Sequence, residues 1–202
     1  QQYLLVNQER KSKELLDEAA DTLEDIRKNN DDARIQSLVR NTYYLQGIVL
    51  GRLGEDASKS FERAEEVQRR LLEKSDNPIS RGELLKILAR AGRMEEAMEL
   101  ADEFAVESNG STWSCGYAAC GYAIISEHLP ENDPQRAALI SKSIELTRKL
   151  VRKHQYHDFE SLRSTDIDFK PLQQNGDYIK MLEEEQKRVQ EEGSSGARTL
   201  QL

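Results

Sequence analysis

Three neighbouring side chains near residue 155 have the chemistry of a metal site. His154, His157 and Asp158 all belong to types that bind metals, and a spacing of three places two imidazoles on one side of a helix turn. A structural zinc site requires four ligands, and no cysteine pair or further histidine lies nearby in the sequence. We therefore expect ordinary surface histidines and no bound metal, with a metal-dependent enzyme as a remote alternative.

Cys115 and Cys120 are the only cysteines, and a reactive thiol would make one of them a nucleophile. Five residues apart on a helix, they point in different directions, which disfavours a disulfide between them. Such cysteines are more often small buried packing residues, so a thiol-dependent enzyme is also a remote alternative. Two thiols without a disulfide framework suit a reducing compartment, and we expect a cytoplasmic location.

The glycines do not form a phosphate-binding pattern. Gly47, Gly51 and Gly54 lie in or at the end of a predicted helix, and they lack the following Gly-Lys-Ser/Thr of a loop that cradles phosphate. Since the histidines and cysteines also have structural interpretations, the sequence predicts no catalytic residues, no cofactor and no metal ligands.

The overall composition limits the classes of partner. The chain has 202 residues, of which 37% are hydrophobic and 33% charged, enough apolar content for a packed core. A formal net charge of −8, without a basic stripe interleaved with aromatics, disfavours nucleic acid as a partner. No run approaches 18 apolar residues, so we expect no membrane insertion. The chain begins with Gln1 inside a helical pattern, and we interpret it as a piece of a longer protein.

Helical periodicity accounts for most of the chain, and no segment has the pattern of a strand. Abundant Ala, Leu, Glu, Arg and Lys favours helices on intrinsic propensity. The predicted helices span residues 3–28, 33–53, 56–73, 80–91, 94–107, 113–128, 134–153 and 177–191. Gly54 provides a C-terminal stop and Asp133 an N-terminal cap. The predicted fold class is therefore all-α, with a disordered tail over residues 192–202.

The spacing of small and aromatic residues resembles that of the tetratricopeptide repeat, a pair of antiparallel helices. Ala57, Phe61 and Ala64 match the second-helix pattern of that family residue for residue. Tyr43, Gly47 and Leu50 resemble the aromatic, small and large positions of a first helix. In the third repeat, Ala118, Ala119 and Tyr122 match the small, small and aromatic positions. The small residues would allow a close approach of the neighbouring helix at these positions.

This resemblance implies an α-α superhelix, or solenoid, of about three divergent repeats. The predicted N-terminal helix spans residues 1–32. The three repeats span residues 33–77, 78–108 and 112–153, and a capping segment with the terminal helix spans residues 154–191. Corresponding positions recur about every 40 residues, against roughly 34 in the standard repeat, and Ser143 stands where alanine is expected. Such arrays bind other proteins, so the expected partner is a protein or peptide segment; the oligomeric state is not predicted.

A second resemblance covers residues 114–182. The runs 117–123, 162–172 and 178–182 resemble elements that close the repeat regions following the kinase domain of planctomycete-type bacterial serine/threonine protein kinases. The resemblance implies a regulatory or substrate-recruiting part of such a kinase. The glycine-rich, His-Arg-Asp and Asp-Phe-Gly motifs of the catalytic domain are absent from this sequence. A free-standing scaffold or adaptor with the same fold is the alternative.

The closing segment also has a mechanical interpretation. The last helix pair of a solenoid has an apolar face that no further repeat covers. We expect that face to be covered by the apolar residues of the segment, namely Phe169, Leu172, Tyr178, Ile179 and Leu182. Asp166 and Asp168 would then cap helix ends or accept hydrogen bonds from backbone amides.

The repeat resemblance also indicates a peptide groove, lined by two positions of each first helix. The groove residues implied in this way are Tyr44, Ile48, Lys86, Arg90 and Cys120. They describe a mostly small and apolar surface with one basic edge, formed by Lys86 and Arg90. A segment carrying an acidic group would suit it.

Overall fold

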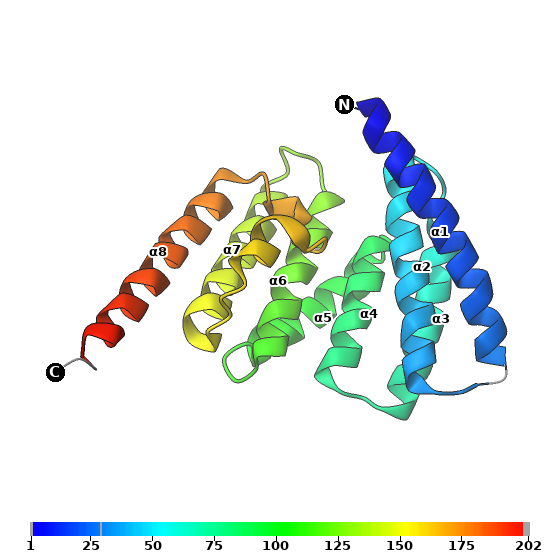
Figure 1. The fold of residues 1–202 in the computed structure, drawn as a ribbon, viewed down its shortest axis with the longest axis horizontal. Coiled ribbons are helices and arrows are strands. Elements are labelled where there is room, and N and C mark those ends of the chain that lie inside the picture. Colours follow the sequence, from blue (N-terminus) through cyan, green and yellow to red (C-terminus); the bar gives the residue numbers. More distant parts are fainter. Residues whose placement is uncertain (1, 29, 200–202) are drawn as a thin grey trace. The chain divides into compact units, whose positions relative to one another are not determined.

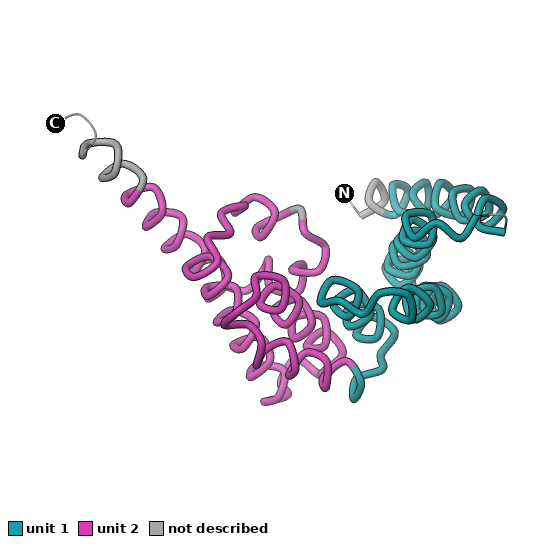
Figure 2. The backbone as a smooth tube through the Cα atoms, turned by 90° about the horizontal axis from the view of Figure 1, so that it is seen from below, with its two compact units in different colours: residues 1–96 teal, residues 97–202 magenta. Residues whose placement is uncertain are grey.

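The computed structural model describes residues 2–28 and 30–199, without the side chains of 2–5, 165 and 193–199. Within this part of the chain every regular element is a helix and no strand occurs, which confirms the all-α class (Figure 1). The α-helices are α1 (Gln2–Lys28), α2 (Ala33–Leu53), α3 (Ser58–Lys74), α4 (Pro78–Arg90), α5 (Met94–Glu107), α6 (Thr112–Glu127), α7 (Pro134–His154) and α8 (Gly176–Thr199). None of them, over its described residues, is long and apolar enough to cross a membrane. The chain divides into unit 1 (residues 1–96) and unit 2 (residues 97–202), which we describe separately (Figure 2).

Local capping chemistry sets several of the helix ends. The Asp32 side chain accepts a hydrogen bond from the Arg34 amide at 2.6 Å, and Gly54 ends α2 with φ of 72°. Helix α4 begins two residues before the predicted start because the Asn77 side chain caps it and Pro78 occupies its first turn.

Unit 1 is built around the hairpin of α2 and α3, with α1 packed on α2 and α4 packed on α3. The tightest point of the hairpin is Gly47. A Cβ atom at this position would lie 2.6 Å from the Phe61 ring, closer than any real contact. The predicted role of Gly47 in close helix approach is therefore seen, with an aromatic ring as the neighbour.

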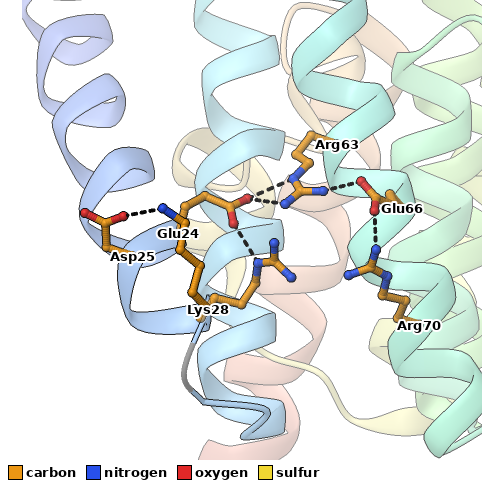
Figure 3. A network of polar contacts seen from close by, with 7 residues as sticks. Glu24, Asp25, Lys28, Arg63, Glu66 and Arg70 are labelled. Atoms are coloured by element: carbon orange, nitrogen blue, oxygen red, sulfur yellow. Dashed lines mark hydrogen bonds and ion pairs between the residues drawn. The ribbon is translucent and has the colours of Figure 1, made fainter.

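A network of charged side chains joins α1 to α3 (Figure 3). The Glu24 carboxylate accepts hydrogen bonds from Arg63 at 2.6 and 2.8 Å and from Arg27 at 2.6 Å. Arg63 also contacts Glu66, which contacts Arg70 one turn further along α3. Ala20 is the only fully buried residue among the described side chains of α1, and Leu16, Ala19 and Leu23 are half-buried, so polar contacts supplement a shallow apolar face.

Unit 2 is built around the hairpin of α6 and α7. Helix α6 is buried on almost all sides, which explains why its sequence is apolar all round. Ser143 of α7, in the position where the repeat pattern has alanine, is completely buried. Its hydroxyl donates a 2.7 Å hydrogen bond to the Ala119 carbonyl of α6. The departure from the pattern thus adds a polar contact at the close approach of the two helices.

The closing segment contains a π-helix, η1 (Ser161–Thr165), and a 3-10 helix, η2 (Lys170–Leu172). Element η2 lies against α6, and α8 lies against α7. Four of the five predicted covering residues are buried, namely Phe169, Leu172, Tyr178 and Leu182, and Ile179 is half-buried. The Asp166 carboxylate accepts a hydrogen bond from the Asp168 amide at 2.9 Å, as expected for a backbone-binding aspartate.

Helix α8 continues beyond the predicted end at Glu191 and extends through Thr199. The helical backbone therefore includes residues 192–199, which the sequence pattern assigned to the tail. Ion pairs across one turn, between Lys187 and Glu191 and between Arg188 and Glu192, favour continuation of the helix through this region. The last three residues of the predicted tail, 200–202, lie outside the described residues.

Candidate interaction surfaces

Two of the predicted groove residues, Tyr44 and Ile48, are buried in unit 1, with 6% and 7% of their surface exposed. The Tyr44 ring packs edge-on against Phe61, with ring centroids 6.3 Å apart. A partner would reach little of either side chain in this structure. Both residues therefore contribute to the hairpin core more than to an open surface.

The predicted basic edge lies beside a carboxylate. Lys86 Nζ is 3.0 Å from Glu83 Oε1 and 5.7 Å from the centroid of the Tyr44 ring. The other oxygen of Glu83 lies 3.0 Å from Arg40 of α2. Arg90 is half-buried one turn after Lys86. The charge of this edge is thus partly balanced within unit 1, which weakens its attraction for an acidic ligand.

The fifth predicted residue, Cys120, belongs to unit 2 and is buried, as is Cys115. The Cys115 thiol donates a hydrogen bond to the Leu146 carbonyl at 3.2 Å. Burial raises the pKa of Cys115 to about 11, so its thiol is protonated at neutral pH. A protonated, enclosed thiol is a poor nucleophile.

The histidines considered as metal ligands also make structural contacts. His154 Nε2 lies 2.9 Å from the Ser108 carbonyl oxygen, and the His157 ring stacks on Phe159 with an interplanar angle of 4°. Among the side chains that the structure describes, no group of three or more His, Cys, Asp or Glu is placed to hold a metal ion.

An open groove that sequence reasoning missed lies in unit 2, between α5 and α7. It has a volume of about 740 Å³. Its apolar lining comes from Ala105 and Val106 of α5, Tyr122 of α6 and Leu146 of α7. Tyr122 and Leu146 are buried beneath the groove, so most of the accessible apolar surface belongs to Ala105 and Val106. Val106 is 81% exposed, so its side chain is accessible to a partner.

The edges of this groove are charged and mainly basic. Helix α7 contributes four basic side chains, which are Lys142, Arg148, Lys149 and Arg152. Two carboxylates, Asp102 and Glu145, also line the groove. We call this surface the α5–α7 groove. Cations therefore predominate on it although the chain as a whole has a net charge of −8.

Hydrogen bonds hold the groove in shape. The Tyr122 hydroxyl donates to Asp102 Oδ1 at 2.5 Å, and Lys142 Nζ lies 4.8 Å from the centroid of the Tyr122 ring. Burial, together with this bond to Asp102, raises the pKa of Tyr122 above its ordinary value, so the phenol remains a donor at neutral pH. On the same side, Lys149 Nζ donates to Ser108 Oγ at 2.7 Å. The floor and part of the rim are therefore ordered before any partner binds.

The sequence contained one signal that points to this groove. Basic residues recur on α7 at 142, 148, 149 and 152, a density that is unusual in so acidic a chain. The repeat resemblance directed attention to the first helices of the hairpins instead. The groove lies between α5 and α7, which follow α4 and α6 in chain order.

Comparison of the chain with family models, with curated proteins and with solved structures gives no match.

Proposed function

We propose that this chain is a non-catalytic module that binds other proteins. The observation that carries the proposal is the α5–α7 groove, an open surface with an apolar floor and a charged rim. Protein-binding sites combine these features, because apolar contacts supply affinity while charged groups at the rim supply orientation and specificity. Its exposed Val106 would gain contacts that are missing in the isolated chain.

The chemistry of the reactive side chains supports a binding role over the metal- or thiol-enzyme alternative. The Cys115 thiol is enclosed and bonded to a backbone carbonyl, and His154 contacts another carbonyl. A nucleophile or a general base must instead lie within reach of a substrate. These residues have packing partners that account for their presence.

The repeat architecture belongs to the same proposal. The close approaches at Gly47 in unit 1 and at Ala119 in unit 2 support hairpins of the tetratricopeptide kind. The buried closing segment supports a capping role for residues 162–182. Its resemblance to the closing elements of bacterial serine/threonine kinases favours a regulatory or substrate-recruiting part of a kinase. A gene that encodes no kinase domain upstream of Gln1 would instead favour the free-standing scaffold.

Site-specific photo-crosslinking tests the binding role. Val106 is replaced by benzoylphenylalanine in the full chain, which is then irradiated inside cells that naturally express it. The matched control carries the same group at Lys180, an exposed position on α8. We expect discrete protein adducts from position 106 and none, or different ones, from position 180. Equal adduct patterns, or none from position 106, would contradict the proposal.

A further inference from the structure

We infer that the α5–α7 groove takes an acidic amphipathic helix of a partner protein, an inference that rests on the proposed binding function and adds the chemistry of the ligand. The groove combines an apolar floor with a basic rim. A ligand that satisfies both must carry apolar side chains on one face and carboxylates beside them. Those are the features of an amphipathic helix rich in Glu or Asp.

Charge complementarity is the first argument. Four basic side chains of α7 line the groove, against the carboxylates of Asp102 and Glu145. Arg148 and Arg152 already lie beside Glu185 of α8, so Lys142 and Lys149 supply most of the charge available to a ligand. The Lys142 side chain is half-exposed, so its ammonium can meet a second carboxylate although it lies 3.5 Å from Asp102. Complementary charges accelerate association and select against basic partners.

The spacing of the cations is the second argument. Lys142 and Lys149 are seven residues apart, which corresponds to two turns, or roughly 10 Å, along α7. Arg148 and Arg152 are one turn apart. A partner helix lying along α7 presents side chains with the same periodicity. Carboxylates at positions four or seven residues apart would therefore meet successive cations.

The third argument is that α7 already binds one helix in this way. Glu185 of α8 is almost completely buried and accepts hydrogen bonds from Arg152 at 2.6 and 2.8 Å. Arg148 lies 3.9 Å from the same carboxylate. These two arginines also line the α5–α7 groove. The structure thus contains an internal example of a helix held on α7 by a carboxylate between arginines.

The floor of the groove favours a protein over a polyanion such as RNA. Phosphate backbones are bound by cations and by hydrogen-bond donors, and they gain little from aliphatic surface. Val106 and Ala105 provide aliphatic surface next to the cations. An acidic helix uses both kinds of surface, whereas a nucleic acid would leave the apolar part uncovered.

The test uses the full chain and a labelled synthetic helix of about five turns. The helix carries Leu along one face and Glu at seven-residue intervals beside it; its control replaces each Glu by Gln. Binding is measured by fluorescence anisotropy at low and at high salt. We expect the Glu helix to bind about tenfold more tightly than the Gln helix at low salt. That advantage should shrink in high salt because ions screen the rim.

Two charge reversals locate the binding site. Lys142→Glu places a carboxylate on the rim and should weaken binding of the Glu helix by about tenfold. Lys180→Glu makes the same change at the exposed surface of α8 and should leave binding within about twofold, since it touches no groove residue. Circular dichroism checks that both variants keep the helical content of the parent chain.

Equal affinity for the Glu and Gln helices, or equal effects of the two reversals, would overturn the inference. A single-stranded RNA that binds as tightly as the Glu helix and is equally sensitive to Lys142→Glu would also overturn it. The crosslinking experiment separates this failure from failure of the proposed function. Adducts at position 106 without binding of the acidic helix refute the ligand chemistry alone, whereas absent adducts refute the binding role.

Discussion

The two outer helices, α1 of unit 1 and α8 of unit 2, are attached to their hairpins by different means. Helix α1 buries only Ala20 fully among its described side chains and adds charged contacts such as that between Glu24 and Arg63. Its half-buried apolar side chains are Leu16, Ala19 and Leu23. Helix α8 buries Tyr178, Met181 and Leu182 as well as the Glu185 carboxylate. The apolar face of α8 is therefore more deeply buried than that of α1.

The energetic consequence follows from typical magnitudes. Burying a large apolar side chain contributes about 1.5–3 kcal/mol, whereas an ion pair near the surface contributes about 0–1 kcal/mol. We therefore expect α8 and the closing segment to be integral to the folding of unit 2. Helix α1 should open more readily than α8, and more so in high salt, because its charged contacts are screened.

The largest expected difference between the regions concerns leucines. Leu172→Ala in η2 removes a side chain with 0% exposure and should lower the free energy of unfolding of unit 2 by about 2–5 kcal/mol. Leu15→Ala in α1 removes one that is 58% exposed and should change stability by less than about 0.5 kcal/mol. Urea denaturation followed by circular dichroism measures both. Similar losses in the two variants would break the comparison.

A smaller difference is expected for two carboxylates that are each held by arginines. Glu185→Gln keeps the volume of a side chain with 1% exposure but removes its charge, and should cost about 2 kcal/mol. Glu24→Gln makes the same change at 18% exposure and should cost less than about 1 kcal/mol. Hydrogen exchange of the α8 and α1 amides reports the two effects separately. If Glu24→Gln lowers stability more than Glu185→Gln does, the polar contacts of α1 contribute more than those of α8.

The same carboxylates give a pH dependence with a defined sign. Burial alone would raise the pKa of each carboxylate. Hydrogen bonds from Arg152 and Arg188 outweigh burial at Glu185 and lower its pKa from 4.5. Hydrogen bonds from Arg27 and Arg63 have the same effect on the pKa of Glu24. Their stabilising contribution is therefore complete above about pH 4.5, the unfolded value, and is lost as the pH falls through the lowered pKa values. Acid titration should loosen α8 less in Glu185→Gln than in the parent chain.

The smallest expected effect tests the hairpin of unit 1. Gly47→Ala forces a methyl group against the Phe61 ring, and the overpacking should outweigh the gain in helix propensity, for a net loss of about 1 kcal/mol. Gly51→Ala, one turn further along α2, meets no atom within 4 Å and should stabilise the chain by up to about 1 kcal/mol. Thermal unfolding of both variants gives the signs. If both substitutions raise the Tm, the contact between Gly47 and the Phe61 ring is not tight.

Prediction from the sequence succeeded where the determining contacts are local. The Asp133 cap joins residues two apart, and the helix predicted over residues 94–107 has the bounds of α5, Met94–Glu107. The end of α8 lies beyond the predicted end at residue 191, and the ion pair between Arg188 and Glu192 one turn apart favours this continuation. The groove residues transferred from the repeat pattern included Tyr44 and Ile48, whose burial depends on neighbouring helices.

The sequence by itself determined that the chain is helical, where most helices begin and end, and which residues are small enough for close crossings. These properties depend on periodicity and on contacts within a turn or two. Only the tertiary structure decided that Arg152 holds Glu185, 33 residues away, and that α5 and α7 frame an open groove. Such features depend on which helix faces pack together, and a pattern of residue types along one helix does not specify its neighbour.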